Sequence, residues 1–286
     1  MAREICIQNS RLIKRPLGIA DIIGGTGWKY GTLDDHGRID TGKIKPDGPL
    51  VIYDTSRIGR GVQIIGIESN KEIKLALPVP STDRDVTLLY EIAEKIADLW
   101  KSKHIIVEED KVSISDIGRY VEYDHNMNIS FLKNVRETFK CEWVDLSCAT
   151  LHISITIRQL EEFSDDYNSF GNYLHEKQKT NVWMPFPLIA QVQGEITPLY
   201  VVFDSGHIIL PKEPQMKHIV DGKEILCQEA CVIVSELFPG QKHSLLNYET
   251  FLQRVPPQKT EEFDHRHIMV KPLSINELKA IFSEKI

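Results

Sequence analysis

The sequence predicts a soluble α+β protein with mainly antiparallel sheets, two long amphipathic helices and a short C-terminal helix. Its 286 residues are 42% hydrophobic and 26% charged, a balance typical of globular chains with a packed core. Short runs rich in Val, Ile and Leu lie between turn-forming Gly, Pro, Asn and Asp residues, as in antiparallel sheets. Two longer segments repeat apolar residues at the three- and four-residue steps of a helix.

The first third of the chain predicts strands after a glycine-rich stretch. Leu17 to Ile23 is expected to form two helical turns that end at Gly24-Gly25. Residues 24–48 hold seven of the 17 glycines, which predicts loop with short strands and turns at Asp34-Asp35 and Asp47-Gly48. The expected strands here are Ile5 to Asn9, Leu50 to Asp54, Val62 to Glu68 and Glu72 to Leu77, the last three as an antiparallel meander.

The clearest helix is predicted from Thr82 to Lys101. Thr82 can cap the first turn, and Asp83 and Asp85 complement the positive end of the helix dipole. One apolar stripe faces a sheet and consists of Val86, Leu89, Ala93, Ile96 and Trp100.

The second half predicts a strand, a helix and several hairpins. Leu146 to Ile157 alternates as one strand, and Arg158 to Gln178 carries the second long apolar stripe. Residues 115–139 are ambiguous between helix and loop. Two further strands are expected, at His104 to Glu108 and His267 to Val270, and a C-terminal helix capped by Ser274. One hairpin is expected to pair Leu199 to Phe203 with His207 to Leu210 around Asp204-Ser205-Gly206. Another is expected around Asp221-Gly222.

Composition suggests two lobes, residues 1–145 and 146–286, with a single compact domain as the alternative.

The net charge of −7 and the pI near 5.8 argue against a nucleic-acid partner, although residues 1–80 carry a local excess of basic residues. No apolar run approaches the ~18 residues of a spanning helix, so we expect no membrane partner. The N-terminus lacks a secretory pattern and the five cysteines are irregularly spaced, which favours a cytoplasmic location.

One turn carries candidate binding residues. Arg57 and Arg60 stand on a glycine-bearing turn between two predicted strands, where their guanidinium groups could bind an anion or an acidic partner. The structural alternative is a turn whose arginines pair with nearby acids such as Asp54.

Other motifs fail on spacing. Gly24 to Lys29 lacks the phosphate-loop pattern, and His175 to Lys179 lacks the second histidine of a zinc-protease helix. His265 and His267 could share one face of a strand, but no further metal ligands are indicated. The sequence therefore predicts no catalytic residues, no metal and no cofactor.

Four segments carry a resemblance. The run from Ile52 to Gly61, Pro80 to Asp85, Tyr167 to Gln178 and Ile209 to Pro211 together resemble an uncharacterised bacterial family of about this chain length. The resemblance spans most of the chain and implies a bacterial cytoplasmic origin, but it supplies no catalytic residues.

Two functions stay open. The first is a non-enzymatic protein-interaction partner of immunity or regulatory type, which the absence of a complete catalytic motif favours. The second is a hydrolase or transferase whose site is assembled from separated residues around the arginine-bearing turn. The partner is expected to be another protein, and the sequence leaves the oligomeric state open.

Overall fold

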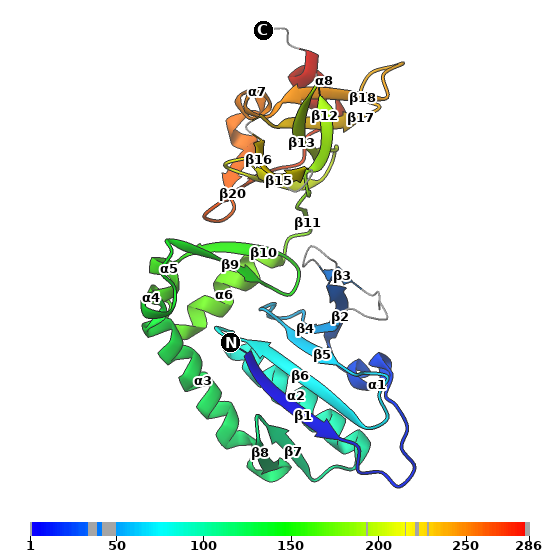
Figure 1. Ribbon diagram of the computed structural model, residues 1–286, viewed down its shortest axis with the longest axis vertical. Helices are drawn as coiled ribbons and strands as arrows, with labels where there is room; N and C mark the ends of the chain where they lie inside the picture. The colour runs from blue at the N-terminus through cyan, green and yellow to red at the C-terminus, as the bar shows by residue number, and fades with distance from the viewer. Residues whose placement is uncertain are drawn as a thin grey trace. The chain divides into compact units, whose positions relative to one another are not determined.

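A computed structural model describes residues 2–33, 39–41, 50–192, 194–214, 216–220, 223–227 and 229–283. The chain forms two compact units, Met1–Thr180 and Asn181–Ile286, and each is considered by itself (Figure 1). The lobe boundary expected at residue 145 lies within strand β9 (Trp143–Ser147) of the first unit. The described residues contain no helix long and apolar enough to cross a bilayer.

An eight-stranded antiparallel sheet forms the frame of the first unit. Its strand order is β3-β2-β4-β5-β6-β1-β7-β8, so the predicted meander β4-β5-β6 is confirmed. Buried residues alternate with more exposed ones along β1 and β6, because only one face of the sheet is covered at these two strands. The strands are β1 (Ala2–Gln8), β2 (Trp28–Leu33), β3 (Ile39–Thr41), β4 (Leu50–Asp54), β5 (Val62–Ile65), β6 (Glu72–Pro78), β7 (His104–Val107) and β8 (Asp110–Ser113).

Helix α2 (Asp83–Trp100) covers that face, as Figure 1 shows. The predicted stripe from Val86 to Trp100 is fully buried against β1, β4, β5, β6 and β7. Thr82 caps the helix, since its side chain accepts a hydrogen bond from the Asp85 backbone N–H. The helix ends at Lys101, which adopts the left-handed conformation with φ 55°. Helix α1 (Ile19–Ile23) packs beside α2.

A smaller layer completes the first unit, settles one ambiguous segment and corrects two expectations. The ambiguous segment 115–139 is mostly a long helix, α3 (Ile117–Lys133), followed by the short α4 (Val135–Thr138). The single strand expected at 146–157 is a hairpin of β9 and β10 (His152–Thr156), because residues 148–151 turn. The helix expected from 158 to 178 is broken into α5 (Ile157–Glu162) and α6 (Tyr167–Gln178). Ser164-Asp165-Asp166 at the break favour turns over helix interiors.

The second unit has two four-stranded sheets and a separate hairpin. The sheets have the orders β12-β13-β17-β18 and β11-β14-β20-β19, and β15 pairs with β16. Its core is apolar and includes Tyr248 and Phe251 of α7 (Tyr248–Arg254) and Leu278 of α8 (Ile275–Ser283). The strands are β11 (Val182–Trp183), β12 (Leu188–Val192), β13 (Glu195–Val201), β14 (His207–Pro211), β15 (Met216–Val220), β16 (Lys223–Cys227), β17 (Cys231–Ser235), β18 (His243–Asn247), β19 (Thr260–Glu262) and β20 (His267–Val270).

One predicted hairpin of this unit is wrong and another is confirmed. β13 and β14 flank the expected turn, but β13 pairs with β12 and β17, whereas β14 pairs with β11 and β20. The turn at Ser205, with φ 65°, therefore passes the chain from one sheet to the other. β15 and β16 do pair, although their turn at Asp221-Gly222 lies outside the described residues, as do the turns at Asp34-Asp35 and Asp47-Gly48. The predicted strand β20 and the short C-terminal helix are confirmed. The fold class is thus α+β.

The α2 core gives a direct test of this architecture. Leu89→Ala should lower the free energy of unfolding by about 2–5 kcal/mol, because Leu89 is fully buried and its truncation leaves a cavity. Glu94→Ala on the exposed face of the same helix should change it by less than about 0.5 kcal/mol. Urea unfolding measures both values, and similar values for the two variants would contradict the placement of α2.

Candidate functional site

The turn after β4 is fastened to the rest of the first unit by one buried carboxylate. Asp85 accepts hydrogen bonds from the backbone N–H groups of Arg60 and Gly61, each at 2.9 Å, and from the side chain and backbone N–H of Thr82. The capping carboxylate of α2 therefore also fixes the turn. The sequence contained this signal, because Thr82 and Asp85 have the spacing of a capping box.

Gly59 lets the carboxylate approach. A Cβ atom built on Gly59 would lie 2.2 Å from Asp85 Oδ2, well inside van der Waals contact. The carbonyl of Gly59 accepts hydrogen bonds from Ala149 N at 3.0 Å and Gln178 Nε2 at 2.8 Å. The same turn is thereby tied to the loop before β10 and to the end of α6. Sequence reasoning missed Gln178, because nothing in its local pattern indicates that distant contact.

Both predicted arginines bond within the protein. Arg57 Nη1 pairs with Asp83 Oδ2 at 2.8 Å, and Nη2 donates to the Asn168 carbonyl at 3.1 Å. Arg60 donates from Nη1 to the Pro80 carbonyl and from Nε to the Ser147 carbonyl. Burial lowers the pKa of Arg60, opposed by its interactions with Cys148 and Asp85. This geometry favours the structural interpretation of the turn, and an anion- or partner-binding role for Arg57 and Arg60 stays a prediction.

One histidine lies beside this turn, and another lies beside the start of α2. His175 Nδ1 accepts a hydrogen bond from the Ile58 backbone N–H at 3.0 Å, and His125 Nε2 lies 3.2 Å from the Asp83 carbonyl oxygen. The ring of His125 also contacts Tyr167 edge-on. Each histidine thus has a ring nitrogen engaged with the protein's own backbone.

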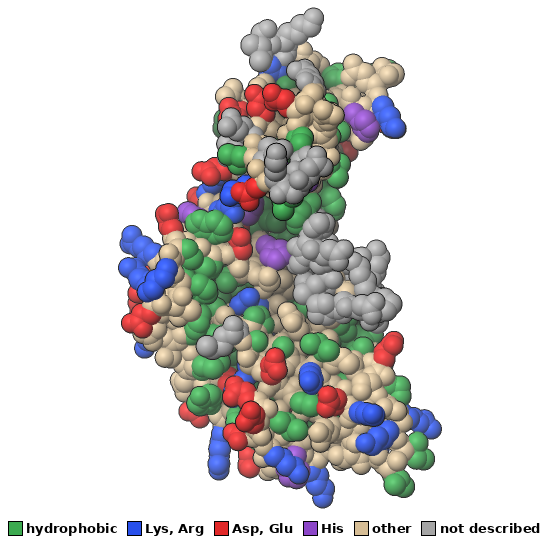
Figure 2. Space-filling view, viewed as in Figure 1, with side chains coloured by type: hydrophobic (Ala, Val, Ile, Leu, Met, Phe, Trp, Pro, Cys, Tyr) green, Lys and Arg blue, Asp and Glu red, His purple; other side chains and the backbone are tan. Residues whose placement is uncertain are grey.

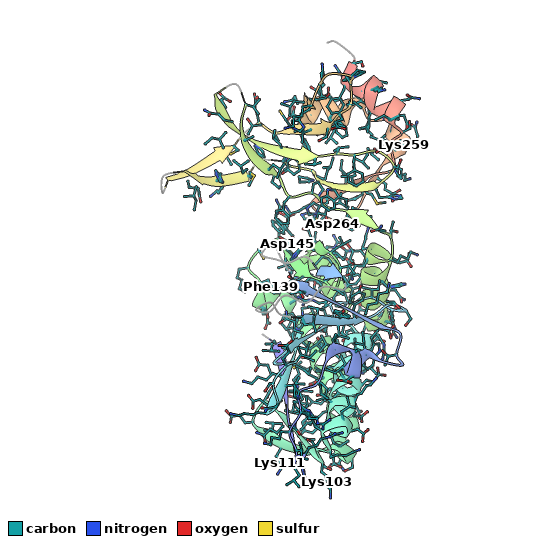
Figure 3. All side chains as sticks on the ribbon, turned by 90° about the vertical axis from the view of Figure 1, so that its right-hand side faces the viewer. Lys103, Lys111, Phe139, Asp145, Lys259 and Asp264 are labelled. Atoms are coloured by element: carbon teal, nitrogen blue, oxygen red, sulfur yellow. The ribbon has the colours of Figure 1, made fainter. Side chains whose placement is uncertain are left out.

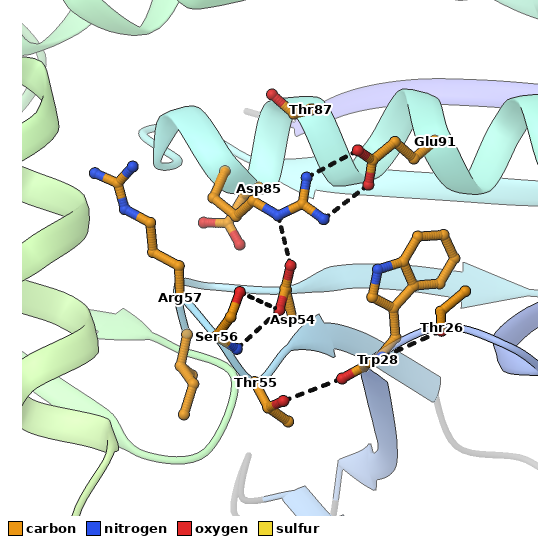
Figure 4. A network of polar contacts seen from close by, with 12 residues as sticks. Thr26, Trp28, Asp54, Thr55, Ser56, Arg57, Asp85, Thr87 and Glu91 are labelled. Atoms are coloured by element: carbon orange, nitrogen blue, oxygen red, sulfur yellow. Dashed lines mark hydrogen bonds and ion pairs between the residues drawn. The ribbon is translucent and has the colours of Figure 1, made fainter.

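A third arginine, Arg84, organises an open groove that includes residues 54–56. Its Nε donates to Asp54 Oδ2 at 2.7 Å, and its two terminal nitrogens bind both oxygens of Glu91, at 3.0 and 2.8 Å (Figure 4). The acid expected beside Arg57 therefore pairs with Arg84 instead. Arg84 and Glu91 lie two turns apart on one face of α2, which allows this two-pronged contact.

The groove has a volume of about 770 Å³ and is lined mostly by polar and charged residues. Its floor includes Asp54, which also accepts hydrogen bonds from the backbone N–H and hydroxyl of Ser56, at 2.8 and 2.7 Å. Its edge includes Lys95, which donates to the Gly24 carbonyl at 2.6 Å and lies 5.7 Å from the centre of the Trp28 ring. The lining consists of Thr26, Gly27, Trp28, Asp54, Thr55, Ser56, Arg84, Glu91, Glu94, Lys95 and Asp98, and includes neither Arg57 nor Arg60.

The histidine pair near the C-terminus does not share a strand face. His267 begins β20, while His265 lies in the preceding bend. His267 Nδ1 lies 2.8 Å from Asp264 Oδ1, which also accepts the backbone N–H of Arg266. Within the described part of the chain, no three His, Cys, Asp or Glu side chains are grouped to hold a metal ion.

Gly59→Ala tests the attachment of the turn. The added methyl group must displace the Asp85 carboxylate, so we expect a loss of about 2–4 kcal/mol in the free energy of unfolding. Gly118→Ala is the matched control, since a Cβ there meets nothing within 4 Å and alanine has a higher helix propensity than glycine in α3. Chemical denaturation of both variants is the measurement. Equal stability of Gly59→Ala and the unsubstituted protein would rule out the close approach.

The Asp54 carboxylate should make the free energy of unfolding depend on pH. Burial raises its pKa, but hydrogen bonds from Ser56 and Arg84 together outweigh this and lower the pKa below its usual value. The ionised carboxylate therefore stabilises the fold above about pH 4, the unfolded pKa, and this contribution is lost as the pH falls through the lower folded pKa. Asp54→Asn should cost about 1–3 kcal/mol at pH 7 and progressively less in acid. Stability curves of both proteins from neutral to acidic pH test this, and a difference independent of pH would contradict it.

Comparison with known proteins identifies the family of this chain but gives no function for the groove. No curated protein and no solved structure matches the chain. A family model described as a domain of unknown function matches residues 2–281, which confirms the resemblance to an uncharacterised family. The chain therefore belongs to the family DUF4299.

Proposed function

We propose that this protein is a non-enzymatic interaction partner whose groove between Trp28 and Asp98 receives a cationic segment of another protein. The observation that carries the proposal is the charge of the groove. Its lining has four carboxylates, Asp54, Glu91, Glu94 and Asp98, against two cations, Arg84 and Lys95. A protein surface with this excess attracts basic side chains and repels acidic ones.

Both cations of the groove are engaged internally. Arg84 is held by Asp54 and Glu91, and Lys95 is held by a backbone carbonyl and the Trp28 ring. The side chains of Glu94 and Asp98 are exposed at the rim. Among the described residues, Asp98 forms an ion pair only with Lys101, which is also exposed. The charge offered to a partner is therefore negative.

The shape of the groove also supports a macromolecular partner. It is open to solvent along one side of α2 rather than enclosed, so it can accept side chains that project from another surface. An enzyme that handles a small substrate usually buries most of it in a deeper pocket. The alternative is a hydrolase or transferase. His175 and His125 do not favour it, because their ring nitrogens are engaged with the backbone at Ile58 and Asp83.

Charge reversal at the rim tests the proposal. Glu94→Lys/Asp98→Lys should weaken capture of the native partner at least tenfold in pull-downs from cells that express the protein naturally, because the groove would repel a basic segment. Glu122→Lys/Glu137→Lys makes the same change in net charge at exposed positions on α3 and α4. A partner held equally by both variants would overturn the assignment of the groove. Repeated failure of the unsubstituted protein to recover any partner under gentle conditions would overturn the interaction role itself.

A further inference from the structure

The loop between β1 and α1 presents two aliphatic side chains to solvent. Leu12 is 101% exposed and Ile13 is 72% exposed, the two highest values among the large apolar side chains of the described residues. They are adjacent in sequence, with Arg11 before them and Lys14 and Arg15 after them. Single exposed aliphatic residues are common, but a neighbouring pair without any contact to the core needs an explanation.

The protein holds this loop at both ends. Asn9 is buried, and its side chain accepts a hydrogen bond from Arg11 N at 3.0 Å and donates to the Asn70 carbonyl at 3.0 Å. On the far side, the Arg15 carbonyl accepts hydrogen bonds from Trp100 Nε1 at 3.2 Å and Asn9 Nδ2 at 3.3 Å. Hydrogen bonds thus hold the loop on both sides of Leu12 and Ile13, and these two side chains are exposed to solvent.

The surface around the apex is basic. Asn9 N donates to the Lys71 carbonyl, and Ser102, which Lys101 and Lys103 flank, donates to the Gln8 carbonyl. The adjoining segments 9–15, 70–71 and 101–103 contain no acidic residue and six exposed basic residues, Arg11, Lys14, Arg15, Lys71, Lys101 and Lys103. Of these, Lys101 pairs with Asp98.

Figure 3 shows the end of the first unit that carries Lys103. Lys103 and Lys111 lie together at one end of the first unit, far from Phe139 and Asp145 of the same unit (Figure 3). In Figure 2, Lys and Arg side chains lie along the lower edge of the view, with acidic and apolar side chains among them. Taken together, segments 9–15, 70–71 and 101–103 are basic, unlike the chain as a whole.

We propose that residues 11–15 form a docking loop for an anionic lipid surface. Leu12 and Ile13 would enter the boundary between headgroups and acyl chains, while the surrounding lysines and arginines contact lipid phosphates. Basic residues flanking an exposed apolar tip provide the two weak signals that reversible membrane attachment requires. A nucleic acid or an acidic protein would use the charges but would leave two adjacent aliphatic side chains without a role. The proposal differs from the expectation of no membrane partner, because that expectation rested on the lack of an apolar run long enough for a spanning helix.

Vesicle cosedimentation of the full chain tests the proposal. We expect binding to vesicles of phosphatidylcholine with about one third phosphatidylglycerol, weaker binding when NaCl is raised from about 0.1 to about 0.5 M, and little binding to phosphatidylcholine alone. Leu12→Ser/Ile13→Ser should weaken binding about tenfold or more, because the apolar contribution is lost. Arg11→Gln/Lys14→Gln should also weaken it at least tenfold, since each basic residue contributes about fivefold.

Matched variants at other exposed positions provide the controls. Ile219→Ser/Leu226→Ser removes two exposed aliphatic side chains from β15 and β16, and Lys140→Gln/Lys242→Gln removes two exposed lysines elsewhere. Both should bind vesicles as the unsubstituted protein does. Thermal unfolding should be the same for all variants, because the altered side chains are exposed.

Four results would overturn the proposal. The first is that the unsubstituted protein does not bind anionic vesicles, and the second is that it binds neutral vesicles equally well. The third is that Leu12→Ser/Ile13→Ser binds as the unsubstituted protein does. The fourth is that Leu12 and Ile13 mediate self-association without vesicle binding. Unchanged binding of the aliphatic variant would assign the loop to a polyanion or acidic protein instead. None of these results depends on the groove, so the test is independent of the proposed function.

Discussion

The carboxylate of Asp85 is the contact on which the first unit depends. It caps the first turn of α2 and also holds the backbone of the turn between β4 and β5. Since α2 covers the sheet and the turn joins two of its central strands, this single group fixes the helix relative to the strands it covers. Its carboxylate accepts hydrogen bonds from four N–H and O–H donors, which offset the cost of burying it.

A second buried group joins the other end of the sheet to the helices. Asp124 of α3 accepts a hydrogen bond from Tyr90 of α2 at 2.6 Å and pairs with Arg3 of β1 at 3.0 Å. Burial raises the pKa of Asp124 in spite of these two partners. Buried pairs of this kind add little net stability, but loss of one partner leaves an uncompensated charge. The network therefore serves to fix how β1, α2 and α3 meet.

Three arginines show how position decides what a charged side chain does. Arg57 and Arg60 stand out in the sequence, yet their guanidinium groups bind Asp83 and backbone carbonyls of the same chain. Arg84 has no distinctive motif, yet it organises the groove through Asp54 and Glu91. The sequence could indicate that arginines lie near acids, but 30 residues separate Arg84 from Asp54, and only the folded sheet brings them together.

Local chemistry in the sequence determined the α+β class, the amphipathic helix α2 with its cap, the meander β4-β5-β6, the hairpin β15-β16 and the family resemblance. These features arise from periodicity and capping within a few residues, which a single sequence displays directly. The tertiary structure alone decided that β13 and β14 join different sheets and that Gln178 reaches Gly59. Those outcomes depend on contacts between distant segments, whose free energy is gained only when the segments pack together. The arginine-bearing turn was visible in the sequence, whereas the acidic groove beside it required the folded chain.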